Sequence, residues 1–195
     1  MRYPEEHKEQ TRDRIVRAAS RRFRGRGESN VAIADLMQEL KLTHGGFYRH
    51  FDSKQELFAE SIEKALEEGA EKLLSVVKKA RPGMELECII GVYLSPEHCA
   101  RAAEGCPIAA LASEIARHPR AVRVRFDKAV RDFAKRFAKF LPGSTEGERQ
   151  RNFAVLFSGM SGALSLARAV ADEGMRRMIL EGARDLYVQS FCSPR

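Results

Sequence analysis

Apolar residues recur along most of this chain at the three- and four-residue intervals of an amphipathic α-helix. The clearest stretch is 119–141, where six apolar residues follow one another at intervals of four, four, three, four and three. They are Val122, Phe126, Val130, Phe133, Phe137 and Phe140. Similar spacing predicts further helices over 33–40, 53–80, 146–172 and 175–191, and a short apolar one over 84–94. Another starts at Gly105-Cys106-Pro107 and runs to the break at His118-Pro119. No alternating pattern of useful length predicts a strand, so the sequence predicts an all-α fold.

Proline, glycine and capping residues predict where these helices begin and end. Ser53 and Thr145 each precede a glutamate by three residues, which is the spacing of a capping box. Proline in the first helical position predicts helix starts at Pro96 and Pro107. The breaks between helices contain Pro82-Gly83, His118-Pro119 and Pro142-Gly143.

Residues 43–54 carry the strongest functional signal. The helix over 33–40 is followed by a turn at Lys41-Leu42 and then by a short helix that begins with small residues. This is the layout of a helix-turn-helix, whose second helix lies in the major groove of DNA and reads base edges with its N-terminal residues. Gly45 and Gly46 lower the helix propensity of this segment. Either they loosen a surface helix, or they allow the backbone to approach DNA closely.

Residues 11–58 resemble the N-terminal domain of the TetR family of bacterial transcriptional regulators. Two positions depart from the family pattern: Lys41 occupies a turn position that is usually glycine, and Ala32 stands where serine or threonine usually opens helix 2. A lysine at positive φ costs about 1 kcal/mol, and a missing N-cap costs a similar amount unless Asn30 replaces it. The resemblance runs through Thr11-Arg12, Ile15, Ala18-Ala19, Phe23, Gly27, residues 33–37, residues 42–48, His50-Phe51, Ser53-Lys54 and Leu57.

The resemblance implies a three-helix DNA-binding domain over residues 1–54 and a helical ligand-binding and dimerisation domain over residues 55–195. The DNA-binding residues implied by matching positions are Thr43, His44, Gly45, Tyr48, Arg49, His50 and Lys54. The first three of these face base edges or nearby backbone, while Tyr48 and Lys54 contact phosphates. Arg49 and His50 are either contacts or exposed spacers. Phe47 and Phe51 are expected in the core of the small domain.

The C-terminal helices suggest how the chain pairs. Small residues cluster at 158–163 in the middle of a helix, where glycine costs up to about 1 kcal/mol relative to alanine unless another helix packs against the backbone. In the TetR family the last two helices form a four-helix interface with a second subunit, although packing within one subunit uses small residues too. The expected interface residues are Ser158, Gly159, Gly162, Ala163, Leu166, Ile179, Ala183 and Leu186.

The ligand pocket is inferred only from apolar placement. The expected lining residues are Cys88, Ile89, Val92, Tyr93, Cys106, Phe126, Phe133 and Phe157. The residues around Gly105-Cys106-Pro107 also resemble a subgroup of the same family. Residues 117–139 carry nine Lys/Arg against two Asp/Glu, which is either a solvated helix face or a basic rim near the mouth of the pocket that favours an acidic ligand.

Charge and cysteine content narrow the class of protein. The net charge is +7, and residues 1–54 carry 12 Lys/Arg against 8 Asp/Glu, which suits a phosphate-lined partner. No apolar run approaches the length of a membrane span and no apolar signal core opens the chain, so we expect a cytoplasmic, nucleoid-associated protein with no membrane partner. The four cysteines lack metal-binding spacing, and we expect free thiols with no metal or cofactor.

Three function classes remain. A thiol enzyme would use Cys106 at a helix start, but no catalytic triad, phosphate loop or metal cluster accompanies this residue. A membrane-surface adaptor would use the amphipathic helix 117–139 and would leave the helix-turn-helix without a role. The third class is a homodimeric repressor released from an inverted-repeat operator by a small, largely apolar effector. We favour this class, with a thiol-sensing repressor that uses Cys106 as its variant. The effector, the operator and the choice between repression and activation remain open.

Overall fold

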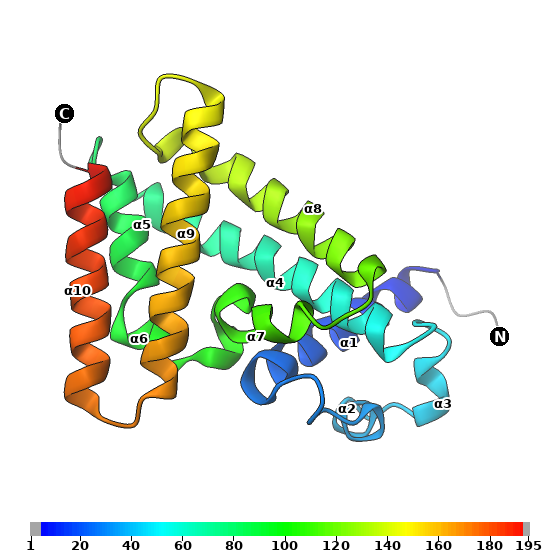
Figure 1. Ribbon diagram of the computed structural model, residues 1–195. Coiled ribbons are helices and arrows are strands. Elements are labelled where there is room, and N and C mark those ends of the chain that lie inside the picture. Colours follow the sequence, from blue (N-terminus) through cyan, green and yellow to red (C-terminus); the bar gives the residue numbers. More distant parts are fainter. Residues whose placement is uncertain (1–4, 193–195) are drawn as a thin grey trace.

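The computed structural model describes residues 5–192, and every regular element in that range is helical. The first three helices are α1 (Glu5–Arg26), α2 (Ile33–Glu39) and α3 (His44–Phe47). The expected all-α fold is therefore confirmed, with α2 and α3 at one end of the molecule and the last two helices at the other (Figure 1).

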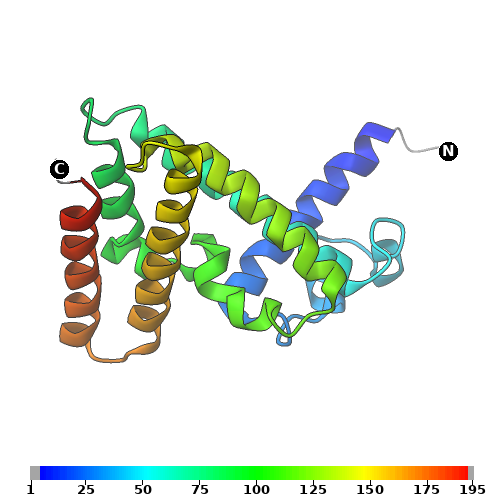
Figure 2. The ribbon, with the colours of Figure 1, turned by 45° about the horizontal axis from the view of Figure 1, so that its top comes forward.

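The long helix α4 (Lys54–Val77) crosses between these two ends (Figures 1 and 2). It packs along α1 on one side and along α8 (Arg120–Phe137) on the other. Its buried stripe includes Leu57, Phe58, Ile62 and Leu66, at the spacing of one helix face. Because α4 belongs to both packing layers, any tilt of this helix moves α1 relative to the C-terminal helices.

Shorter elements fill the centre of the molecule. After the turn at Pro82-Gly83 come α5 (Glu85–Tyr93), α6 (Pro96–Ala100), the 3₁₀ turn η1 (Ala102–Glu104) and α7 (Pro107–Ile115). Both predicted proline starts are confirmed, since Pro96 and Pro107 each occupy the first turn of a helix. A second 3₁₀ turn, η2 (Ala138–Phe140), ends the segment that the apolar stripe predicted as one helix.

The last two helices, α9 (Glu146–Ala169) and α10 (Glu173–Cys192), form an antiparallel pair. Thr145 caps α9 with the predicted capping box: its side chain accepts from the Glu148 N–H, and the Glu148 carboxylate accepts from the Thr145 N–H. At α4 only half of the predicted box forms. The Ser53 hydroxyl accepts from the Glu56 N–H at 3.1 Å, but the Glu56 carboxylate accepts from the Asp52 N–H.

Ion pairs fasten α1 to α4. The Arg12 guanidinium lies 2.9 Å from Glu56 and 2.5 Å from Glu60, and it also lies over the Phe51 ring. The hydrogen bond to Glu60 raises the pKa of Arg12 despite partial burial, so this side chain stays charged. Helix α1 is thus held to α4 by both apolar packing and charge.

Candidate DNA-binding surface and effector cavities

The turn between α2 and α3 depends on Lys41. This lysine has φ of 57°, the left-handed conformation expected of the glycine that it replaces. Hydrogen bonds from the Lys41 N–H to the Gln38 carbonyl (2.9 Å) and from the Leu42 N–H to the Met37 carbonyl (2.8 Å) close the end of α2. The turn therefore keeps its geometry without glycine, at a cost of about 1 kcal/mol.

The start of α2 lacks a side-chain cap. Ala32 occupies the N-cap position and makes no capping hydrogen bond. Asn30 does not replace it, because its side-chain amide donates to the Arg26 carbonyl at the end of α1. The idea that Asn30 caps α2 in place of residue 32 is therefore wrong. Helix α2 relies instead on the packing of Leu36 and Met37, which are both fully buried.

Helix α3 presents its first turn outward. Thr43 caps it by accepting from the Gly46 N–H at 3.2 Å. His44 and Gly45 are exposed, and Tyr48 is 62% exposed with its ring edge-on to His44. A Cβ at Gly45 would meet no atom within 4 Å. Nothing within the chain therefore requires glycine at this position.

The opposite side of α3 faces the core. Phe47 and Phe51 are each 1% exposed, and their rings stack at 5.5 Å between centroids. They hold α3 against the small domain, as the sequence predicted, and leave the outward residues free to meet a partner.

The remaining expected DNA contacts differ in accessibility. Arg49 is exposed, whereas His50 is half-buried and its backbone carbonyl accepts from Arg12. Burial lowers the pKa of His50, and the nearby cations Lys8, Arg12 and Arg49 lower it further, so its ring is neutral at pH 7. Lys54 is also half-buried, and its amine donates to the Glu28 carbonyl at 2.6 Å. A phosphate contact by Lys54 requires its amine to share or leave that bond.

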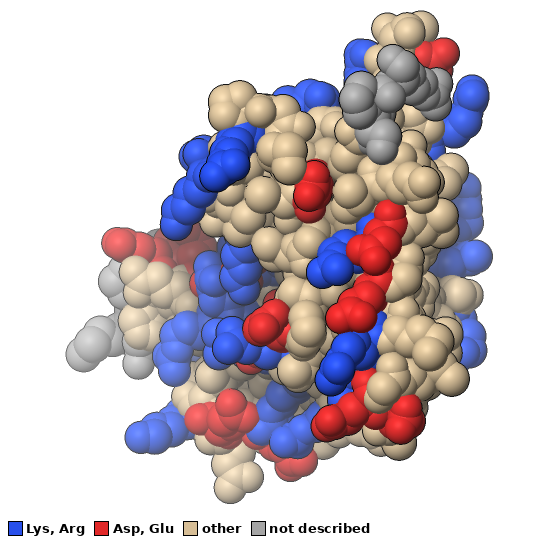
Figure 3. Space-filling view, turned by 90° about the vertical axis from the view of Figure 1, so that its left-hand side faces the viewer, with Lys and Arg blue, Asp and Glu red and all other residues tan. Residues whose placement is uncertain are grey.

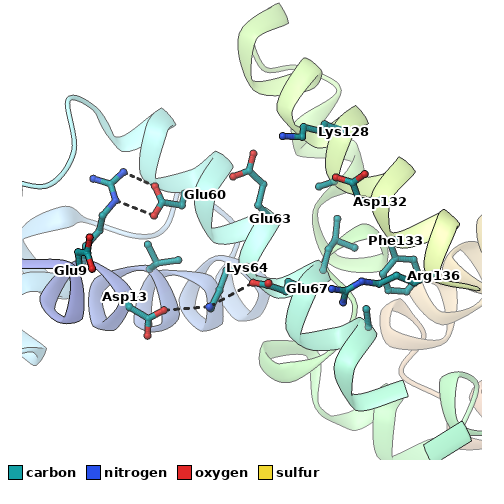
Figure 4. Close-up of a pocket in the computed structure, with 15 residues that line it drawn as sticks. Glu9, Asp13, Glu60, Glu63, Lys64, Glu67, Lys128, Asp132, Phe133 and Arg136 are labelled. Carbon is teal, nitrogen blue, oxygen red and sulfur yellow. Dashed lines mark hydrogen bonds and ion pairs between the residues drawn. The ribbon is translucent and has the colours of Figure 1, made fainter. Parts of the chain in front are cut away.

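Three hollows lie behind this surface. A groove of about 530 Å³ separates α1 and α4 from α8 and is lined mostly by charged side chains. Figure 4 shows Glu60, Glu63 and Glu67 of α4 on one side and Lys128, Asp132 and Arg136 of α8 on the other. On one side of this groove, Lys64 of α4 pairs with Asp13 of α1 and with Glu67 of its own helix.

Six of the eight expected pocket residues are divided between the other two hollows. The α4–α7 cavity, about 300 Å³, is lined by Val92, Tyr93, Cys106 and Phe133, together with Lys72, His98, Arg101 and two glutamates. The α7/α8/α9 groove, about 480 Å³, is lined by Phe126 and Phe157. Cys88 and Ile89 line neither of them.

Aromatic rings separate these two hollows. Phe157 lies 5.1 Å from Phe133 and 5.6 Å from Tyr93 between ring centroids, edge-on in both pairs. Phe153 stacks on Phe157 at 4.4 Å. The predicted pocket is thus two spaces with a ring partition, which the apolar spacing alone does not reveal.

Comparison with known proteins identifies the N-terminal domain. The model of the family described as "Bacterial regulatory proteins, tetR family" matches residues 15–61. The HTH-type regulator YfiR of Bacillus subtilis is 35% identical over 68 residues, which are 35% of this chain and 33% of that protein. TtgR of Pseudomonas putida is 37% identical over 57 residues, 29% of this chain and 27% of TtgR. The match spans about a third or less of the length of these curated relatives.

The fold agrees over nearly the whole chain. The reduced form of Escherichia coli NemR superimposes with a TM-score of 0.78 at 17% identity, covering 95% of this chain and 98% of NemR. A TetR transcriptional regulator from Chloroflexus aurantiacus gives 0.75 at 21% identity, covering 96% and 100%. Residues 15–61 therefore match the tetR family of bacterial regulatory proteins, and nearly the whole chain shares the fold of these solved regulators.

Cys106 lies where the α4–α7 cavity meets the start of α7. It is the N-cap residue, ahead of Pro107, and its N–H donates to His98 Nε2 at 3.1 Å. The other ring nitrogen of His98 lies 2.6 Å from the Tyr93 carbonyl, so the neutral ring carries its proton on Nδ1. Burial lowers the pKa of His98, in agreement with this neutral form. The thiol is free, and half-buried.

Two chains of contacts join α7 and the residues just before it to the N-terminal helices and the start of α4. Arg24 of α1 donates to the Gly105 carbonyl at 2.6 Å, beside the cavity. At the other end of α7, Glu114 accepts from the Glu28 N–H at 2.8 Å and His118 lies 2.9 Å from the Glu28 carboxylate. Glu28 therefore contacts α7 through its N–H, the turn after α7 through its carboxylate, and α4 through the bond from Lys54 to its carbonyl.

The outer face of α9 and α10 carries an unusual share of exposed apolar side chains. Leu166, Met178 and Leu186 are 55%, 68% and 57% exposed. Figure 3 shows the side of the molecule that includes α10, where uncharged surface is broad and charged side chains form narrow strips. Monomeric proteins rarely leave such a patch uncovered. Val155 and Met175 of the same two helices are exposed as well.

The expected interface residues divide between two roles. A Cβ at Gly159 would overlap the Tyr187 hydroxyl, so this glycine serves the packing of α9 on α10 within one chain. A Cβ at Gly162 would meet nothing within 4 Å, and Ser158, Leu166 and Leu186 are likewise exposed. Ala163, Ile179 and Ala183 are half-buried between the two helices.

Within residues 5–192, no group of three or more His, Cys, Asp or Glu side chains is placed to hold a metal ion. In the same range, no helix is both long enough and apolar enough to pass through a bilayer.

Proposed function

We propose that this TetR-family protein is a homodimeric repressor that binds an inverted-repeat operator through α3 and leaves it when a small effector enters the C-terminal domain. Residues 1–54 read the DNA, residues 55–195 bind the effector and form the dimer, and the protein acts in the cytoplasm. The outward face of α3 carries the proposal most directly: Thr43, His44 and Gly45 are exposed beside Tyr48, while Phe47 and Phe51 anchor the helix from behind.

Different residues read the DNA sequence and position the protein on the DNA. Thr43, His44 and Gly45 occupy the first turn of α3, the part of a recognition helix that meets base edges. Tyr48, Arg49 and Lys54 contact phosphates, which fixes register without specifying sequence. His50 supports this surface from within, because its ring is half-buried and its carbonyl holds Arg12.

Dimerisation through α9 and α10 is supported by the exposed apolar face of these helices. Pairing with the same face of a second copy removes Leu166, Met178 and Leu186 from water, at about 25 cal/mol per Å² of apolar surface buried. A two-fold axis through this face also gives two α3 helices related by symmetry, which an inverted repeat requires.

The effector binds in the α4–α7 cavity with its apolar part against Leu66, Leu73 and Phe133. Binding there changes the DNA-binding helices only if the effector favours one arrangement of the two reading helices over the other. Two contacts can transmit that preference: Arg24 on the Gly105 carbonyl, and Glu28 on both α7 and α4.

A second mode of release rests on Cys106. Its free thiol lines the same cavity at the start of α7, so an electrophile or oxidant that enters the cavity meets a nucleophile. Modification there would push on Gly105, the residue that Arg24 holds. We rank reversible binding first because the cavity offers several polar and apolar contacts without a covalent step.

Selection of bound sequences from a random DNA pool tests the function directly. We expect an inverted repeat with half-sites about 34 Å apart, or a multiple of that distance. The comparison variant carries His44→Ala and Arg49→Ala, which alter two exposed side chains. It should melt at the same temperature as the native protein but should not enrich the inverted repeat. Recovery of no sequence, or of the same sequences by the variant, would refute recognition through α3.

A further inference from the structure

The α7/α8/α9 groove differs from the other hollows in its chemistry. Its floor is apolar, and its only charged lining residues are Arg131 and Lys135 of α8. The α4–α7 cavity includes Glu97 and Glu104 among its lining residues, and the α1/α4/α8 groove includes six carboxylates. The apolar lining residues of the α7/α8/α9 groove are Ile108, Phe126, Val130, Ala134, Phe153, Ala154 and Phe157.

The two cations stand together at the edge of this floor. Arg131 and Lys135 are four residues apart on one helix, so their side chains share one face of α8. Each already has a carboxylate nearby: Asp127 lies 3.3 Å from Arg131, and Asp132 lies 3.6 Å from Lys135. Both pairs are strongly exposed, at 55–73% for the four side chains, and exposed pairs contribute little free energy. An anion at the rim can therefore recruit both cations at small cost.

The charge of α8 as a whole favours an anion as well. The helix carries seven Lys/Arg against Asp127 and Asp132, so the potential at its surface is positive. The volume of about 480 Å³ lies within the range of small-molecule sites. Gln150 and Ser158 add uncharged polar atoms on the α9 side.

We propose that the α7/α8/α9 groove binds an amphipathic organic anion, with its apolar body on Phe126, Val130 and Phe157 and its carboxylate at Arg131 and Lys135. The occupant is a small molecule with one anionic end, such as an aliphatic or aromatic carboxylic acid. This site is separate from the α4–α7 cavity, since the rings of Phe133, Phe157 and Tyr93 lie between them. The proposal is independent of operator binding.

A second copy of the chain is the competing occupant. The groove includes Ala154 and Ser158 of α9, and the neighbouring Val155 is 54% exposed, so the groove borders the proposed dimer face. Charge argues against this occupant, because the groove of a second copy would bring the same two cations toward another positive α8. A small amphipathic anion, in contrast, matches both the apolar floor and the positively charged rim of the groove.

Calorimetric titration of the full chain without DNA tests the proposal. Octanoate is the probe, and octan-1-ol and octyltrimethylammonium are its neutral and cationic equivalents. We expect octanoate to bind roughly ten-fold more tightly than octanol, the size of effect that two exposed charge contacts give, and the cation to bind least. Equal affinities for octanoate and octanol, or no binding of octanoate, would overturn the proposal.

Variants assign the binding to this groove. The double variant Arg131→Gln, Lys135→Gln should lose the roughly ten-fold preference for octanoate and keep the affinity for octanol. Its matched control is Lys128→Gln, Arg136→Gln, which removes one lysine and one arginine of α8 that line the groove of Figure 4 and do not line the α7/α8/α9 groove. If the control loses as much affinity as the test variant, general attraction to α8 explains the binding and the site is refuted.

Filling the floor gives a test that does not depend on charge. Ala134→Phe places a ring over the groove and should weaken octanoate and octanol alike by more than ten-fold, and thermal melting checks that the variant is folded. Undiminished binding would locate the ligand elsewhere. If Ala134→Phe instead changes the sedimentation of the protein without ligand, the groove is a subunit contact and the proposal fails.

Discussion

The substitution Gly45→Ala separates the stability of α3 from its recognition of DNA. Gly45 is the second residue of α3, directly after the Thr43 cap and His44, and an added Cβ meets no atom within 4 Å. Alanine is favoured over glycine in a helix by up to about 1 kcal/mol. Within the protein alone, the variant should therefore be slightly more stable than the native chain, and for a protein of this size its Tm should rise by about 2–4 °C at most.

Operator binding should change in the opposite sense. If the first turn of α3 lies against DNA, the added methyl group occupies space that a base edge or phosphate needs. Overpacking by one methyl group costs roughly 1–3 kcal/mol, so affinity should fall at least about five-fold for each half-site. Fluorescence anisotropy with the selected operator, at one fixed salt concentration, measures this loss.

Gly147→Ala is the matched control. Gly147 is the second residue of α9, also follows a threonine N-cap and also has no atom within 4 Å of an added Cβ. It should gain similar stability and bind the operator with native affinity. Native affinity in Gly45→Ala would show that Gly45 only loosens a surface helix, and would refute close approach of its backbone to DNA.

Further substitutions test the other parts of the proposal. Lys54→Ala should weaken binding to all sequences alike and lower the slope of log affinity against log salt by about one unit, as measured by titrations at several salt concentrations, and Tyr48→Phe should weaken binding without altering the preferred sequence; a changed preference would reassign both residues. Gly162→Leu adds a side chain at an exposed position and should yield monomers in sedimentation, whereas Val124→Glu, at a residue of α8 that is 51% exposed, should leave the dimer intact; a tight Gly162→Leu dimer would exclude this face. Gly159→Ala should lower the Tm, because its methyl group overlaps Tyr187, and an unchanged Tm would contradict that packing. Cys106→Ser should preserve release from the operator by every effective compound if binding is reversible, and loss of release by any of them would establish thiol chemistry.

Local sequence determined where the helices begin and which residues of the helix-turn-helix are buried. Helix starts at Pro96, Pro107 and Glu146 follow from proline and capping residues, whose effects act within one turn. Burial of Phe47 and Phe51 follows from their spacing, because one face of a short helix must cover the small core. The positive φ of Lys41 was expected from the family resemblance, because it occupies a turn position that is usually glycine.

Tertiary structure alone decided which surfaces face one another. Gly159 and Gly162 are neighbours in one cluster, yet one meets Tyr187 and the other meets solvent. Phe133 and Phe157 were both expected to line one pocket, yet their rings touch and line two different hollows, the α4–α7 cavity and the α7/α8/α9 groove. Lys54 is tied to the Glu28 carbonyl across 26 residues of sequence. Helical periodicity fixes the direction in which a side chain points along its own helix, whereas the partner that it meets depends on how separate helices pack, and that packing is set by contacts between residues far apart in the chain.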